Sequence, residues 1–122
     1  MATVLTNVGE QWAAECMAQT NALSGQYIGW GTGAGTAAKG DTTLFTEATE
    51  ARVAGTVSVS GTGSAAKYQV VGTLTADGAK TITNAGNFTA SSAGTLIVHG
   101  DFTGIALALN DRIEFTVTID PS

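Results

Sequence analysis

The sequence predicts an all-β domain in which two antiparallel sheets pack as a sandwich, with one short α-helix near the N-terminus. Apolar and polar residues alternate in seven or eight short segments, and turn residues separate these segments about every 8–12 residues. No second helical pattern lies between the segments, and parallel strands need such crossovers, so we expect antiparallel pairing. A jelly-roll topology is preferred and an immunoglobulin-like one is the alternative, although the Cys pair around a strand Trp of antibody domains is absent.

Length and composition fit one domain. The chain has 122 residues, and two domains would each be too small to bury an adequate core. We expect a single domain, 1–122, made of an N-terminal arm (1–6), a helix (7–18) and the sandwich (26–120). The content of 43% hydrophobic and 12% charged residues excludes a disordered chain and a coiled coil. Ten acidic and five basic residues give a net charge of −5, so we expect no nucleic-acid partner.

The helix is predicted from its start signal and its apolar face. Asn7 and Glu10 have the spacing of a capping box, with Asn in place of the usual Ser or Thr. Val8, Trp12 and Cys16 then recur at every fourth position, which places them on one helical face. Because so short a helix is marginal alone, we expect Trp12 to anchor it in the sandwich; the alternative is an anchor in another subunit.

The strands are predicted from period-2 alternation. The clearest is the last, in which Ile113, Phe115, Val117 and Ile119 alternate with polar residues over 112–119. The other strands are expected at 27–30, 51–59, 67–74, 80–83 and 95–99, with turns at 60–64, 77–78, 91–94 and 110–111.

Residues 31–40 (GTGAGTAAKG) contain almost no side chain large enough to pack. We predict a long mobile loop or an extended arm there. Gly29, Gly31 and Ala34 match a relaxed dinucleotide fingerprint, but no helix start follows to hold a pyrophosphate. We therefore expect no nucleotide cofactor.

No constellation of residues predicts catalysis or metal binding. His99 is the only histidine, and a metal site needs several such ligands. Asp101 lies two residues further along a strand and is able to orient His99, but no G-x-S-x-G motif marks a nucleophile. We expect a strand-end histidine bonded to a neighbour. Two acidic pairs, Glu47 with Glu50 and Asp111 with Glu114, lie in polar sequence and are expected at the surface.

We expect neither a targeting signal nor a membrane span. The first residues lack a basic region followed by an apolar run, and no stretch approaches the roughly 18–20 apolar residues of a span. The protein is therefore expected to fold in a cytoplasm with Cys16 reduced. A single Cys also excludes an intrachain disulfide and a Cys-based zinc site.

Several short motifs follow one another in an order that carries a family resemblance. They are Leu5-Thr6-Asn7-Val8-Gly9-Glu10-Gln11-Trp12, Tyr27-Ile28-Gly29-Trp30, Glu50-Ala51-Arg52-Val53-Ala54-Gly55, Ile82-Thr83-Asn84-Ala85-Gly86, Gly94-Thr95-Leu96 and Gly100-Asp101-Phe102. The chain resembles small virion proteins of tailed bacteriophages, variously labelled capsid decoration (cement), tail-fibre-like or minor structural proteins. The resemblance covers most of the chain and rests on structural residues, not catalytic ones.

The resemblance implies a non-enzymatic virion protein on the capsid exterior, made in the host bacterial cytoplasm, which stabilises the capsid by bridging major capsid subunits. It implies the major capsid protein as partner and a homotrimer as assembly, without a cofactor or a membrane partner. The arm and the loop at 31–40 are then the expected contact segments. The contact residues that we predict are Ala2, Thr3, Val4, Leu5, Trp30, Thr32, Thr36 and Lys39.

Two other functions stay open. One is a tail-associated module, in a fibre or baseplate, that binds host glycan or protein through Trp30 and the polar loops. In a purely structural role, Trp30 would instead plug one end of the sandwich. The other function is an enzyme or a small-molecule-binding sandwich. The sequence contains no cluster of ligand-binding residues that would support it.

Overall fold

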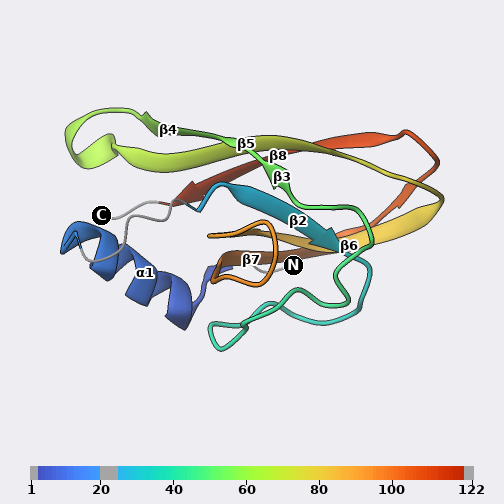
Figure 1. The fold of residues 1–122 in the computed structure, drawn as a ribbon, viewed down its shortest axis with the longest axis horizontal. Coiled ribbons are helices and arrows are strands. Elements are labelled where there is room, and N and C mark those ends of the chain that lie inside the picture. The colour runs from blue at the N-terminus through green and yellow to red at the C-terminus, as the bar shows by residue number, and fades with distance from the viewer. Residues whose placement is uncertain (1–2, 20–24, 120–122) are drawn as a thin grey trace.

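A computed structural model describes residues 3–19 and 25–119, and within them the predicted all-β sandwich with one short helix is confirmed (Figure 1). The strands form a five-stranded sheet in the order β1-β7-β6-β2-β3 and a three-stranded sheet in the order β4-β5-β8, and every pair is antiparallel. The elements are β1 (Thr3–Leu5), α1 (Asn7–Met17), β2 (Tyr27–Gly31), β3 (Val53–Ala54), β4 (Thr56–Ser60), the 3₁₀ turn η1 (Gly63–Ala65), β5 (Lys67–Thr75), β6 (Lys80–Phe88), β7 (Leu96–Leu107) and β8 (Arg112–Ile119).

The core lies between the two sheets. Ile28 and Trp30 of β2 meet Val70 and Leu74 of β5, and Ile82 of β6 completes the cluster; each of these side chains is at most 1% exposed. In β5 and β8 the inward residues alternate with outward polar ones, as the period-2 pattern predicts. A few strands thus bury most of the large apolar side chains.

The strand predicted at 51–59 is divided between the sheets, which corrects the prediction. β3 pairs with β2 in one sheet, whereas β4 pairs with β5 in the other, and Gly55 lies at the crossing. A Cβ at Gly55 would lie 2.8 Å from the carbonyl oxygen of Val71, so the chain passes close to β5 only because the residue is glycine. Alternation alone does not reveal such a change of sheet.

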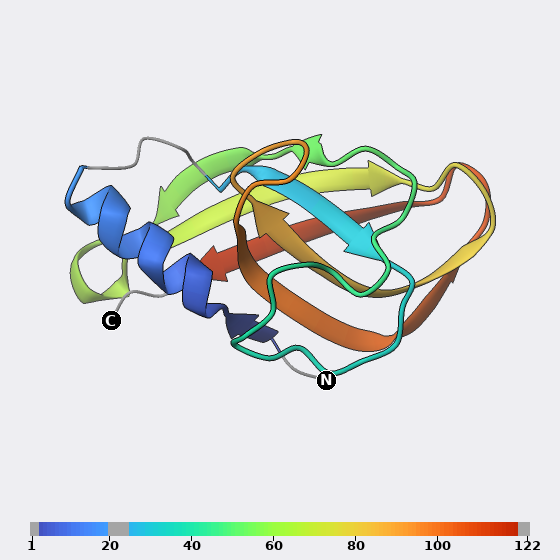
Figure 2. The same ribbon diagram turned by 60° about the horizontal axis from the view of Figure 1, so that its bottom comes forward.

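The N-cap of the helix lies one residue earlier than predicted. Thr6, not Asn7, is the N-cap: its Oγ1 accepts a hydrogen bond of 3.0 Å from the Gly9 amide. The anchoring role predicted for Trp12 is confirmed, since this buried side chain packs edge-on against Tyr68 with 5.6 Å between ring centroids. Figure 2 shows α1 lying across one end of the sandwich, directly after β1.

The prediction that residues 1–6 form an arm is wrong where the structure describes them. Thr3, Val4 and Leu5 pair with Gly100, His99 and Val98 of β7, and β1 is therefore the edge strand of the five-stranded sheet. Leu5 packs in the same apolar cluster as Trp12, which gives the segment a reason to stay on the sheet. Ala2 lies outside the described residues.

β6 and β7 are longer than predicted, and β7 is bulged. Ile82 pairs with Ile105 but Asn84 pairs with Asp101, so one residue of β6 lies opposite three of β7. The bulge, residues 102–104, interrupts the ladder on the part of β7 that extends beyond β1. His99 consequently lies inside a strand and is fully buried, in place of the strand end that we predicted.

Candidate interaction surface

The segment between β2 and β3, residues 32–52, folds back along itself. Thr32 donates its amide hydrogen to Thr46 O (3.0 Å) and Gly33 donates its own to Phe45 O (2.9 Å). Ala37 is only 5% exposed although its side chain is a single methyl group. A long loop is present where we predicted one, and its small residues let backbone approach backbone, so that part of the loop is buried.

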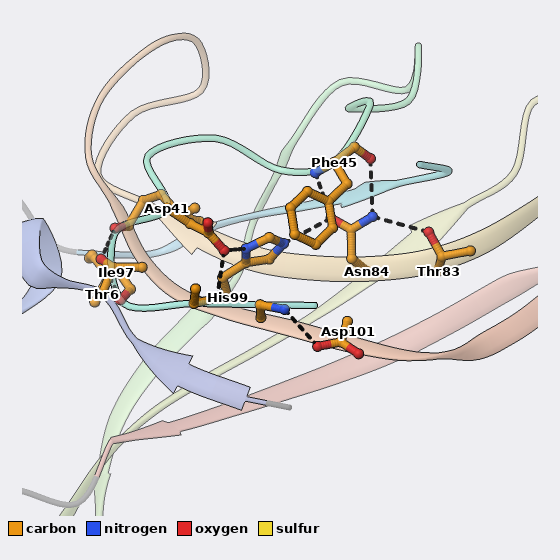
Figure 3. Close-up of polar contacts among 11 residues, drawn as sticks. Thr6, Asp41, Phe45, Thr83, Asn84, Ile97, His99 and Asp101 are labelled. Carbon is orange, nitrogen blue, oxygen red and sulfur yellow. Dashed lines mark hydrogen bonds and ion pairs between the residues drawn. The ribbon is translucent and has the colours of Figure 1, made fainter. Parts of the chain in front are cut away.

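The loop is attached to the outer face of the five-stranded sheet through His99 (Figure 3). His99 Nδ1 lies 2.8 Å from Asp41 Oδ2, and His99 Nε2 lies 3.0 Å from Asn84 Oδ1. The Phe45 ring covers the imidazole, with 4.6 Å between ring centroids. The predicted neighbour-bonded histidine is thus confirmed, but its acidic partner is Asp41 of the loop. Asp101, the partner considered from sequence, accepts a bond from the Ala37 amide instead (2.8 Å).

The hydrogen-bond network places an oxygen atom beside each nitrogen of His99. The Phe45 amide donates to Asn84 Oδ1 (3.0 Å) and Asn84 Nδ2 donates to Phe45 O (3.1 Å), which fixes the orientation of the Asn84 amide. Its oxygen therefore faces Nε2, and the Asp41 carboxylate faces Nδ1. Both ring nitrogens of His99 are thus engaged by side chains of the protein, and the histidine holds the loop to the sheet.

Two segments that were predicted separately as contact regions meet at this place. The Asn7 amide, just after β1, donates to Lys39 O (2.7 Å), and Ala37 is bonded to Asp101, next to the Gly100 that pairs with Thr3. Figure 2 shows the loop running beside β1 and the start of α1. We call this region, made of Thr3, Val4, Thr36, Lys39 and Glu10, the β1–loop surface.

The β1–loop surface is mostly uncharged. Thr3, Thr36 and Lys39 are exposed, and Val4 is half-buried. Its one ion pair joins Lys39 Nζ to Glu10 Oε1 at 2.7 Å, with both side chains about half exposed (55% and 50%). Leu5 is half-buried within the Trp12 cluster, and the exposed Thr32 lies at the other end of the loop beside Thr46. These two predicted residues are therefore not part of the surface.

Trp30 is not a surface residue, and its prediction as a partner contact is wrong. The side chain is 1% exposed and lies edge-on to Phe115, with 6.3 Å between ring centroids. Its indole Nε1 donates to Glu50 Oε1 (3.0 Å). The alternative that we stated, a plug within the sandwich, is what the structure has.

Glu50 is buried as well, contrary to the expected surface position. Its side chain is 8% exposed, and Oε2 accepts from the Asp77 amide (2.9 Å) and from Lys80 Nζ (2.5 Å). Burial by itself raises the pKa of Glu50, but the hydrogen bonds from Lys80, Asp77 and Trp30 outweigh it and lower the pKa from 4.5 to about 2. Glu50 is a structural carboxylate that stays ionised.

Arg52 is a structural residue that sequence reasoning missed. Its guanidinium forms a two-point contact with the Glu47 carboxylate (2.8 and 2.9 Å) and lies 3.4 Å above the centre of the Phe88 ring. It also donates to the carbonyls of Ala90 and Ala93. The remaining predicted acidic pair, Asp111 with Glu114, is exposed, as expected. In the sequence, the one sign of the contact between Arg52 and Glu47 is that a Glu stands five positions before an Arg.

Groupings typical of other functions are missing from the described residues. Within 3–19 and 25–119, no three His, Cys, Asp or Glu side chains gather as a metal-binding group. In the same part of the chain, no helix has the length and apolar character of a transmembrane segment. Comparison with known proteins finds no matching family model, no matching curated protein and no matching solved structure.

Proposed function

We propose that the protein is a non-enzymatic structural component of a bacteriophage virion, which decorates the capsid exterior and stabilises it by bridging major capsid subunits. The observation that carries the proposal is the β1–loop surface. Two segments some thirty residues apart in sequence, each expected to contact the shell, lie side by side and are held there by hydrogen bonds. A preformed surface of this kind binds without a large cost of ordering.

The chemistry of the surface suits a protein partner. Thr3 and Thr36 offer hydroxyl groups, Val4 offers apolar area, and the Lys39–Glu10 pair is neutral overall. The net charge of −5 disfavours contact with the packaged genome. The tail-associated alternative is weakened, because the aromatic residue proposed to stack on a glycan, Trp30, is in the core.

Co-sedimentation with capsids that lack the protein tests the proposal. Wild-type protein is expected to bind saturably, with a stoichiometry that follows capsid symmetry, and to raise the temperature at which the capsids disrupt. Deleting residues 2–6 is a poor test, because it would remove β1 and the Thr6 cap.

Point variants at exposed threonines give the sharper comparison. Thr36→Lys on the β1–loop surface is expected to weaken capsid binding by at least about tenfold. Thr73→Lys, on the outer face of β5, is expected to change it by less than about twofold. Absence of capsid binding, with the protein recovered in purified tails, would overturn the capsid role. Equal weakening by the two variants would overturn the assignment of the surface.

A further inference from the structure

A second interaction site is suggested by β4, which lies at one edge of the three-stranded sheet. Its sequence, Thr56-Val57-Ser58-Val59-Ser60, contains no charged residue and no proline, and it pairs with β5 in five successive registers without a bulge. Proteins usually guard long sheet edges with charges, prolines, bulges or very short strands. The other edges are guarded: β1 and β3 by their lengths of three and two residues, the part of β7 beyond β1 by its bulge, and β8 by Arg112 and Glu114. β4 has none of these features.

β4 also leaves apolar side chains uncovered on the face of the sheet that should be buried. Val57 pairs with Val70 and Val59 with Tyr68, so both valines lie on the core side of the sheet. They are nevertheless 38% and 72% exposed, so the described residues of the five-stranded sheet leave them partly uncovered. Two inward-facing valines beside an unguarded edge are typical of a strand that pairs with another strand.

The charge distribution favours a second copy of the same chain as the occupant. The chain carries a net charge of −5, so two copies repel each other over most of their surface. Residues 51–76, which include all of β4 and β5, contain no Asp or Glu. β4 is thus an edge at which two copies can meet without bringing acidic residues of this stretch together.

The sequence of β4 is also self-complementary in antiparallel pairing. If Ser58 lies opposite Ser58 of a second copy, then Val57 lies opposite Val59 of that copy, and the reverse pair is formed by symmetry. Four valines would then share the core-side face of one six-stranded sheet, and the three serine and threonine pairs would share the outer face. Valine pairs of this kind are among the favourable cross-strand contacts.

We propose that the protein pairs with a second copy of itself through antiparallel β4–β4 contact about a two-fold axis at Ser58. The inference does not depend on the capsid role, and it describes a different assembly from the threefold that the family resemblance implies. A contact of five residues a side is smaller than the 20–30 a side of a standard interface, so the pair is expected to be weak and dependent on concentration.

Sedimentation velocity over about 10 μM to about 1 mM measures the assembly directly. Wild-type protein is expected to move from the mass of one chain to that of two. Val59→Lys places a charge on the edge and, at a position 72% exposed, leaves the fold intact by circular dichroism; it is expected to weaken pairing by at least about tenfold. Thr73→Lys, on the central strand β5, is the matched control and is expected to pair as the wild type does.

Cross-linking tests the register. In a Cys16→Ser background, Ser58→Cys is expected to form a disulfide-linked dimer on mild oxidation, whereas Thr73→Cys stays monomeric. The proposal is overturned if the wild type keeps the mass of one chain throughout, or if it reaches the mass of three. It is also overturned if Val59→Lys and Thr73→Lys weaken pairing equally, or if Ser58→Cys links no better than Thr73→Cys.

Discussion

Thr6 shows how one side chain can connect two elements. Its hydroxyl accepts from the Gly9 amide to begin the helix, and it donates to the Leu96 carbonyl of β7 at 2.6 Å. The side chain is fully buried, so water cannot replace either bond. Sequence reasoning located the start of the helix to within one residue, but it preferred Asn7 because of the Glu three positions later. The second bond, to a strand 90 residues away, leaves no local signal.

Replacing Thr6 by valine keeps the shape of the side chain and removes its hydroxyl. We expect Thr6→Val to lower the free energy of unfolding by about 2 kcal/mol, since the helix loses its cap and a buried carbonyl loses its donor. Urea denaturation followed by circular dichroism measures the change. Thr73→Val, at an exposed site on β5, serves as control and should stay within about 0.5 kcal/mol of the wild type. Similar losses in the two variants would contradict the role given to Thr6.

At the scale of elements, the alternation of apolar and polar residues predicts a strand well when one face of the strand is exposed to solvent, and poorly when both faces are covered. β8 was predicted with its full length because its outward residues are polar. β6 was predicted to stop at Thr83, yet it continues to Phe88, and its residues from Asn84 onward are all buried. Asn84 and Asn87 break the pattern because each binds a loop or a neighbouring strand; Asn87 donates to Gly25 O and accepts from the Val98 amide.

The loop that forms the candidate surface was predictable in its place, but not in its full length or its attachment. Its glycines and alanines indicated a long connection, and the structure has one. Asp41, His99 and Asn84 are at least 15 residues apart in sequence, and no catalytic or metal-binding motif joins them. Only the fold brings them together, so the buried anchor could not be derived from residue spacing.

The contact between α1 and β7 depends on a glycine. A Cβ at Gly9 would collide with the Ile97 carbonyl and lie 2.9 Å from the Ile97 Cα. Alanine favours a helix by about 1 kcal/mol over glycine, but here the helix would have to move away from the sheet. We expect Gly9→Ala to destabilise the protein by about 1–3 kcal/mol, as overpacking does.

Thermal denaturation of two alanine variants separates the steric effect from the general one. Gly78, with no atom within 4 Å of a Cβ placed there, is the control, and Gly78→Ala should leave the melting temperature unchanged or slightly raised. If Gly9→Ala is as stable as Gly78→Ala, the close approach of helix and sheet is not required.

For the whole molecule, Glu50 joins β2 to the turn through which the chain passes from the three-stranded sheet to the five-stranded one. One carboxylate oxygen binds Trp30 of β2, and the other binds Asp77 and Lys80 at the turn between β5 and β6. The turn before β8 is attached there too, because the Asn110 amide donates to Ala76 O and the Ala76 amide donates to Asp111 O. This end of the sandwich is therefore held by a charged group as well as by apolar packing, and its stability should depend on pH.

The direction of that dependence follows from the lowered pKa of Glu50. The folded pKa of about 2 lies below the ordinary value of 4.5, so the folded state favours the ionised form. Its contribution is fully present above pH 4.5 and is lost as the pH falls from 4.5 towards 2. Glu50→Gln should lower the free energy of unfolding by about 2 kcal/mol at pH 7 and flatten its decline across this acid range. Urea titrations at several pH values measure both effects, with the exposed Glu114→Gln as control. If Glu50→Gln declines as steeply in acid as the wild type, another carboxylate governs acid unfolding and the charge of Glu50 does not hold this end of the sandwich together.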